Sequence, residues 1–470
     1  MAKSAEMDLT SGSIFRKLLI YAIPFIFTNI LQILFNAADI AVVGIFVNDD
    51  AVAAVGATSS LNTLICGLFI GLSIGSNIVL ARYVGAQEMD GAHRTVGTSI
   101  LIAIVSGLIL MTIGVPMAET FLKWMDCAPE ILPMAATYLR IYFLGMPIMM
   151  LYNFCASILR AVGDTKRPLI FLAIGGGINV LLNLFFVLVL KMTVEGVAIA
   201  TITSQAISAT LSLIVLFKGK GYGCLKLKYL RFYKKQLGEI VILGIPSGLQ
   251  SVAFNIANVL IQSTVNSFGA VGMSANTTAQ QFDAIVYNVG NAISMSTMAF
   301  IGQNIGAKRM DRVKRVIMDG ILLVAILQFS VGIIFTLLSR FLCGIIASDE
   351  SVIEMAMIRL SILGTFYFLC GIMEVFANSC RAMGKPIFAL FVSVMGATVF
   401  RIIFLEITFA LVPEFYMIFV SYPASWIFTI ICYLFVLPMV YKKTKLKVQG
   451  EQTSTDVQTV EELQAAVTEE

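Results

Sequence analysis

The chain has 470 residues, of which 58% are hydrophobic and only 13% charged, and its mean hydropathy is +0.90. Because soluble proteins carry about 25% charged residues, this composition excludes a water-soluble surface and predicts an integral membrane protein. A net charge of +4 is too small and too scattered for a nucleic-acid-binding protein, and the single histidine, His93, excludes any motif that needs two. None of the eight cysteines forms a C-x-x-C pair, and we interpret them as small buried hydrophobic residues.

Segments long enough to cross a bilayer, about 20 apolar residues each, occur twelve times. In chain order we expect them at 17–46, 52–81, 95–118, 131–159, 168–190, 195–217, 238–267, 274–304, 316–338, 352–380, 387–411 and 416–440. Lysine and arginine collect at both ends of the chain and in alternate loops, whereas the other loops carry acids such as Glu119, Glu130 and Glu350. Since basic loops stay in the cytoplasm, we expect a multi-pass protein of the cell (inner or plasma) membrane with both termini cytoplasmic.

One long internal loop, rich in basic and aromatic residues, divides the chain into two six-helix halves. We therefore expect an N-lobe over 1–217, a cytoplasmic linker over 218–237 and a C-lobe over 238–441. Over 442–470 we expect a disordered acidic cytoplasmic tail, or alternatively a loosely helical one. For the linker we favour a position on anionic lipid headgroups over binding to nucleic acid.

The two halves repeat each other. VGAQEMDGAHR (84–94) aligns with IGAKRMDRVKR (305–315), RAVG (160–163) with RAMG (381–384), and FNAAD (35–39) with FNIAN (254–258), in the same order. Because each half has an even number of spans, both insert with the same orientation, as parallel repeats related by an axis along the membrane normal. The sequence thus predicts an all-α membrane protein, with twelve transmembrane helices in two lobes related by a pseudo-two-fold axis and a cavity between them.

Charges within the spans are few, and each needs a partner, water or a proton. Asp39 shares one helical face with three cavity candidates, Gln32, Phe35 and Asn36. Asn179 and Asn183 lie four residues apart in the fifth span, and Thr201 lies in the sixth. With Asp39 these residues offer oxygen ligands for a hard cation such as Na⁺; alternatively, Asp39 carries a proton.

The second half has its own intramembrane charges, namely Asp283, Glu374, Arg401 and Glu406. Counted from Pro168 and Pro386, Arg401 is the repeat mate of Asn183. For Arg401 a structural ion pair with one of these acids and a role in transport remain equal alternatives. For Arg140 and Arg359, near the outer ends of their helices, we expect no more than snorkelling.

These motifs resemble the MATE (multidrug and toxin extrusion) transporters of the bacterial DinF-like branch, over about residues 14–441. The resemblance rests on NAADIAVVG (36–44), LRAVGD (159–164), GVAIAT (196–201) and GQNIGA (302–307). It implies cation-coupled export of amphipathic, often cationic or aromatic compounds, with the cation site at Asp39, Asn179, Asn183 and Thr201. The family often has an aspartate where this chain has Asn183. Asp39 is then the only acid of the set, and H⁺ is at least as good a candidate as Na⁺.

Cargo is expected between the lobes. The candidate lining residues are Gln32, Phe35, Asn36, Tyr152 and Asn153 from the first half, and Gln250, Phe254, Asn258 and Gln281 from the second. We expect a small-molecule substrate, membrane lipid as surroundings, a monomer, and no cofactor beyond the coupling ion. A flippase for a lipid-linked substrate is the alternative, but it would need a basic cavity, and Arg401 stands against four acids. Without a zinc-protease or nucleotide-binding motif, the sequence does not predict an enzyme.

Overall fold

The computed structural model describes residues 7–125 and 127–468, and within these ranges the regular structure is helical throughout. Eleven helices are long and apolar enough to cross a membrane, or twelve if one bent pair counts as a single span. The predicted fold class and its twelve segments are therefore confirmed.

The N-lobe contains seven α-helices and one π-helical turn. They are α1 (Ile14–Phe46), α2 (Asp49–Gly85), α3 (Met89–Trp124), α4 (Leu132–Leu144), α5 (Met146–Ala161), α6 (Lys166–Leu184), the π-helical η1 (Phe185–Val189) and α7 (Val194–Lys218). The segment expected as one span at 131–159 is bent by 51° between α4 and α5. The bend lies at Gly145, and Pro147 at the start of α5 explains it, because proline cannot donate the hydrogen bond that would continue α4.

The C-lobe repeats this order after a linker that holds the short η2 (Leu227–Tyr229). Its elements are α8 (Lys234–Asn266), α9 (Gly269–Gly306), α10 (Met310–Leu337), α11 (Ser339–Ile346), α12 (Glu350–Ala382), α13 (Pro386–Ser393), the π-helical η3 (Val394–Phe400), α14 (Arg401–Leu411) and α15 (Phe415–Thr468). A π-helical turn thus interrupts the corresponding span of each lobe.

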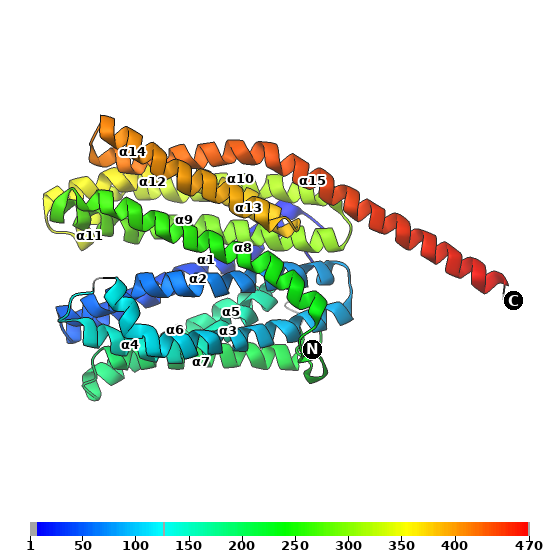
Figure 1. Ribbon diagram of the computed structural model, residues 1–470, viewed down its shortest axis with the longest axis horizontal. Helices are drawn as coiled ribbons and strands as arrows, with labels where there is room; N and C mark the ends of the chain where they lie inside the picture. The colour runs from blue at the N-terminus through cyan, green and yellow to red at the C-terminus, as the bar shows by residue number, and fades with distance from the viewer. Residues whose placement is uncertain (1–6, 126, 469–470) are drawn as a thin grey trace.

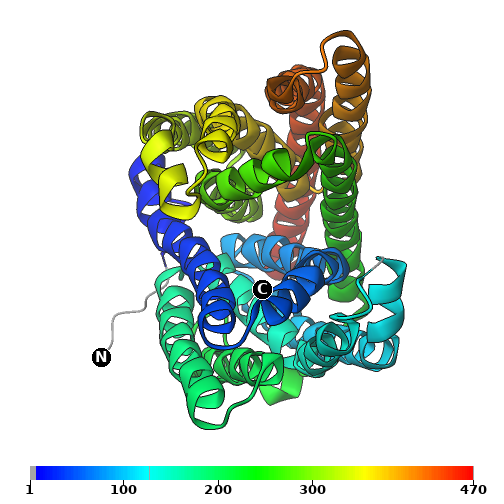
Figure 2. The same cartoon turned by 90° about the vertical axis from the view of Figure 1, so that its left-hand side faces the viewer.

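The two lobes lie one above the other in Figure 1, with the helices of each running roughly along the long axis. We call the end that carries the loops at 86–88, 162–165, 307–309 and 383–385 the basic end, and the opposite end, with the loops at 190–193, 347–349 and 412–414, the acidic end. Figure 2 looks onto the acidic end, and there the two lobes are seen as separate bundles.

A seam of glycines joins the lobes between α2 and α8. A Cβ placed on Gly71 would lie closer than 3.0 Å to backbone atoms of Gly248 and Gly244, and one on Gly75 would collide with the backbone of Ile240. Helices approach this closely only where side chains are absent. The seam therefore depends on glycine from both lobes.

The repeated motifs have a structural role at the basic end. Gly85 and Gly306, which are repeat mates, each pack against the backbone of the other lobe, at Gln303 and Arg82 respectively. The glycines that end RAVG and RAMG, Gly163 and Gly384, have φ angles of +92° and +80°, which favour glycine. The repeat thus preserves backbone geometry at the contact between the lobes.

Hydrogen bonds close the basic end. Gln303 accepts from the backbone of Leu9 at 3.2 Å and donates to the carbonyl of Ala161 at 2.8 Å, while Arg82 donates to the carbonyl of Ala382 at 2.6 Å. The lobes are therefore joined at the basic end by side chains that reach across to backbone carbonyl and amide groups.

The segment before α1 is fixed by Asp8, whose carboxylate accepts hydrogen bonds from Thr10 and Ser11. Partial burial acts to raise the pKa of Asp8, but these hydrogen bonds outweigh it, and the pKa lies below its ordinary value of 3.8. Asp8 is therefore ionised at neutral pH.

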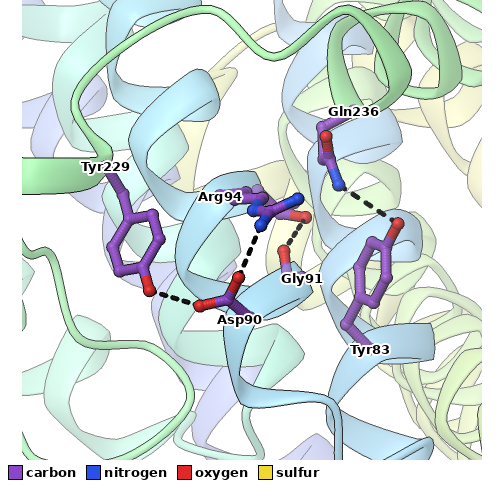
Figure 3. Close-up of polar contacts among 7 residues, drawn as sticks. Tyr83, Asp90, Gly91, Arg94, Tyr229 and Gln236 are labelled. Carbon is purple, nitrogen blue, oxygen red and sulfur yellow. Dashed lines mark hydrogen bonds and ion pairs between the residues drawn. The ribbon is translucent and has the colours of Figure 1, made fainter.

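The linker is packed on the N-lobe rather than extended away from it (Figure 3). The hydroxyl of Tyr229 donates to Asp90, which also pairs with Arg94 at 2.6 Å. The ring of Tyr229 stacks on His93 at 5.5 Å, and Gln236, at the start of α8, donates to the hydroxyl of Tyr83 at 3.2 Å. The basic and aromatic residues of the linker thus include side chains that bind protein.

The acidic tail belongs to the helix α15 as far as the structure describes it. α15 continues as one helix to Thr468, and in Figure 1 it extends well beyond the bundle. The strong helix formers Glu, Gln, Lys and Ala recur along this stretch, and no proline follows Pro438, so local propensity favours the helix. The last two residues of the tail lie outside the described residues.

Candidate cation site and central cavity

A cavity of about 910 Å³ lies between the lobes, within the range of ligand pockets, roughly 300–1,000 Å³. Seven of the nine residues that we expected around the cargo line it: Gln32, Phe35, Asn36, Tyr152, Asn153, Phe254 and Asn258. Because α1 and α8 contribute corresponding residues from FNAAD and FNIAN, the two lobes supply matching faces to the cavity.

Two of the expected lining residues lie elsewhere. Gln250 lines a smaller cavity of about 240 Å³ towards the basic end, where its side-chain oxygen accepts a hydrogen bond from Arg381 at 2.5 Å. Gln281 lines neither of these cavities; its neighbour Gln280 faces the large one instead. One residue corresponds to 100° around a helix, and the pattern of α9 did not distinguish the two glutamines.

Aromatic side chains that sequence reasoning missed form much of the wall. They are Tyr138, Tyr142, Tyr287, Tyr367, Tyr422 and Trp426. Each lies in an apolar span. In such a span the sequence pattern is the same whether an aromatic residue lines a cavity, packs against another helix or faces lipid. The repeat offered no signal for them, and they add aromatic faces to a cavity lined mainly by polar and aliphatic residues.

The four residues of the predicted cation site meet in the N-lobe. Asn183 donates to one carboxylate oxygen of Asp39 at 2.5 Å, and the hydroxyl of Thr201 lies 3.1 Å from the other. Asn179 accepts from Asn183 at 3.3 Å and approaches Thr201 at 3.4 Å. Helices α1, α6 and α7 thus place one carboxylate, two amides and a hydroxyl in a single network.

Glycines in α6 let the three helices come together. A Cβ on Gly176 would overlap the ring of Phe35 in α1, and one on Gly175 would collide with Ser208 in α7. The GGG run just before Asn179 therefore brings the amides of α6 against the carboxylate of α1.

The cluster is buried but borders the cavity. Asp39 is 7% exposed, and it lines the large cavity together with Asn179 and Thr201. The side-chain oxygen of Asn183 is buried and has no hydrogen-bond partner within the described residues. The cluster thus gathers one carboxylate, two amides and a hydroxyl beside the cavity.

The charges of the C-lobe are arranged differently. Arg359 is buried and forms an ion pair with Asp283 at 2.7 Å, and its guanidinium also donates to Asn276. Our expectation that Arg359 snorkels was wrong, because α9 presents an acid and an amide to it inside the lobe. Asp283 is therefore neutralised by its own lobe.

The other C-lobe charges do not join this pair, although Asp283 and Arg359 also line the large cavity. Glu374 and Arg401 both line the large cavity, and no ion pair joins them within 4.0 Å. Glu406 is exposed on α14 and lines neither of the two cavities. Of the four acids weighed against Arg401 in the sequence, only Asp39 and Glu374 remain as unpaired carboxylates at the cavity.

Two repeated bundles of membrane-crossing helices that enclose a polar and aromatic cavity define a membrane transport protein. The sequence profile of the MatE family matches residues 24–185 and 246–406, and the chain belongs to this family. The match covers both repeats and begins in each at the early proline, Pro24 or Pro246.

Curated relatives carry names of the same kind. The chain is 26% identical over 447 residues to the probable multidrug resistance protein YoeA of Bacillus subtilis, covering 92% of this chain and 96% of the relative. It is 21% identical to the multidrug export protein MepA of Staphylococcus aureus, covering 83% and 87%. One relative is thus named for drug resistance and the other for drug export.

Solved structures share the fold. One, described as the outward-facing conformation of a multidrug resistance MATE family transporter of the MOP superfamily, matches with a TM-score of 0.82 at 21% identity, covering 95% of this chain and 98% of the other. At this identity the likeness concerns the arrangement of the helices.

Proposed function

We propose that the protein exports amphipathic compounds, cationic or aromatic, by antiport of H⁺ or Na⁺ with alternating access, across a cell membrane that has the basic end on its cytoplasmic side. The observation that carries the proposal is the position of Asp39. This carboxylate belongs both to the buried N-lobe network and to the wall of the large cavity. An ion bound there and a cationic cargo in the cavity compete for the same negative charge.

The join between the lobes supports alternating access. Hydrogen bonds and the glycine seam hold the lobes together towards the basic end, while the cavity between them is lined by residues further towards the acidic end, such as Gln262 and Asn276. Reversing this arrangement would expose the same cavity to the other side, and the pseudo-symmetry of the lobes makes two such states similar in energy.

The lining supports an aromatic, cationic cargo. Rings such as Tyr142, Tyr287 and Trp426 offer faces that attract flat apolar groups and cations. Asp39 and Glu374 supply the negative charge. Met149 and Met373, which adapt their shape readily, also border the cavity.

The test is transport by the purified protein in liposomes, with a fluorescent cationic dye as cargo and either a pH gradient or a Na⁺ gradient imposed. We expect one of the two gradients to drive the dye, and Asp39→Asn to abolish the gradient-driven part while the protein still inserts and remains monodisperse. Glu406→Gln is the matched control, since it removes an acid from a span without touching the cavity. The proposal would be contradicted if neither gradient changed the rate of dye transport. It would also be contradicted if Asp39→Asn kept the gradient-driven transport of the wild-type protein.

A further inference from the structure

Counted from Pro168 and Pro386, Arg401 in the C-lobe is the repeat mate of Asn183 in the N-lobe. The π-helical turns themselves lie at different places in the two spans, since Asn183 precedes η1 and Arg401 follows η3. The repeat mate of Asp39 is Asn258, which also lines the cavity. Where the N-lobe holds an acid and an amide, the C-lobe therefore holds an amide and a base. The charge at these matched positions thus differs between the two lobes.

One side of the Arg401 guanidinium is held by the C-lobe itself. Its Nε donates to the hydroxyl of Ser425 at 3.0 Å, and its central carbon lies 4.2 Å from the ring centre of Tyr422 and 5.9 Å from that of Trp426. All three partners come from one stretch of α15. These contacts orient the flat group without neutralising it.

Arg401 borders the cavity without an anionic partner among the side chains that the structure describes. Arg401 is 7% exposed and lines the large cavity. Among residues 7–125 and 127–468, no carboxylate lies within ion-pair distance of it, and Ser425 is the only hydrogen-bond partner of its side chain. An arginine fork that is held by its Nε presents its two outer nitrogens in the geometry that a carboxylate accepts.

None of the four acids weighed against Arg401 forms an ion pair with it. Asp283 is bound to Arg359 at 2.7 Å, Asp39 belongs to the N-lobe network, and Glu406 does not line the cavity. Glu374 borders the cavity but also the smaller one towards the basic end. A buried, unpaired cation is costly, and an anionic group that enters the cavity would remove that cost.

We propose that Arg401 is the binding site for a carboxylate on the cargo, so that the transporter accepts zwitterionic amphiphiles. The anionic end of such a molecule pairs with the outer nitrogens of Arg401, and its aromatic body lies along Tyr422 and Trp426. Its cationic end faces the acids Asp39 and Glu374. This inference rests on the proposed function for its direction of transport, but the binding of a carboxylate is independent of the coupling ion.

The test compares a rhodamine that carries a free benzoate with the methyl ester of the same dye. The two differ by one negative charge at the position where a carboxylate would meet Arg401. Binding of each dye to the purified protein is measured by fluorescence polarisation, and export of each is measured in phosphatidylcholine vesicles. We expect Arg401→Gln to lower the acid-to-ester ratio of affinities about 10- to 100-fold, and Arg401→Lys to lower it less, because lysine keeps the charge without the fork.

Controls separate this inference from its alternatives. Arg140→Gln, which removes a half-exposed arginine from the acidic end, leaves the acid-to-ester ratio unchanged. An equal loss of both dyes in Arg401→Gln, or no change in the ratio, would overturn the proposal. The double variant Arg401→Gln with Glu374→Gln gives a further check. If it restores the wild-type acid-to-ester ratio, the proposal is overturned, because the arginine would then act by pairing with Glu374 and not with the cargo.

Two further outcomes distinguish a cargo site from a lipid site, and the carboxylate site from the proposed antiport. A ratio that collapses when phosphatidylglycerol is added to the vesicles would mean that an anionic lipid headgroup, not cargo, occupies the arginine. Failure of Asp39→Asn to affect export refutes the proposed antiport, yet leaves the affinity ratio in detergent as an independent measure of the carboxylate site.

Discussion

The glycine seam between α2 and α8 allows a direct test of how the lobes are held. In Gly71→Ala the new methyl carbon would lie 2.6 Å from the Cα of Gly248, whereas contacts under 3.4 Å are already tighter than most. The helices must then separate by about 1 Å. Because the new methyl group belongs to α2 and would meet backbone atoms of α8, no change of side-chain rotamer relieves the clash.

The magnitude follows from the packing. Overpacking of this kind costs about 1–3 kcal/mol, which corresponds to a change of about 5- to 150-fold in an equilibrium between two arrangements. Since the seam exists when the lobes are joined at the basic end, Gly71→Ala should shift the population away from this arrangement by that factor.

The assay is pulsed electron paramagnetic resonance with spin labels at Lys191 and Glu414, exposed residues in the acidic-end loops of the two lobes. When the lobes are joined at the basic end, the two labels at the acidic end are far apart. We expect the population with this longer distance between the labels to decrease in Gly71→Ala. Gly177→Ala is the matched control, because a Cβ there has no heavy atom within 4 Å. Unchanged distance distributions in Gly71→Ala would refute the view that backbone contact at the seam stabilises this arrangement.

Three further predictions concern the buried ion pair of the C-lobe, the segment before α1 and the linker. Arg359→Leu leaves Asp283 buried and unpaired, so thermal unfolding in detergent should show a loss of about 3–5 kcal/mol, most of which the double variant with Asp283→Leu recovers; a double variant as unstable as the single would contradict the pairing. Because the pKa of Asp8 is lowered, its contacts stabilise the fold above an unfolded-state value of 3.8 and are lost only below it. Asp8→Asn should therefore leave the pH profile of export unchanged near neutrality, and a shifted profile would show that Asp8 titrates there. Tyr229→Phe removes the hydrogen bond to Asp90 and should speed tryptic cleavage of the linker several-fold, whereas an unchanged cleavage rate would mean that stacking alone holds it.

The sequence predicted those features that depend on periodicity. Twelve apolar segments, two repeats and one polar face on α1 all follow from spacing along the chain. Asp39, Asn179, Asn183 and Thr201 meet because each lies on the inward face of its helix, which the 3.6-residue period specifies.

Features that depend on tertiary contact were beyond this reasoning. Arg359 has the position of a snorkelling residue, and only the arrangement of α9 against α12 shows that Asp283 binds it. Gln280 and Gln281 are identical in type and adjacent, so their pattern could not decide which faces the cavity. The bend at Gly145 likewise lay within an unbroken apolar run.

The docked linker determines which part of the chain moves with which lobe. Since Tyr229 and Tyr233 lie against the first turns of α3, the crossing peptide travels as part of the first bundle, and the pivot lies at the beginning of α8. A fluorophore attached to this peptide would consequently report the motion of the first half, although half of the chain follows it.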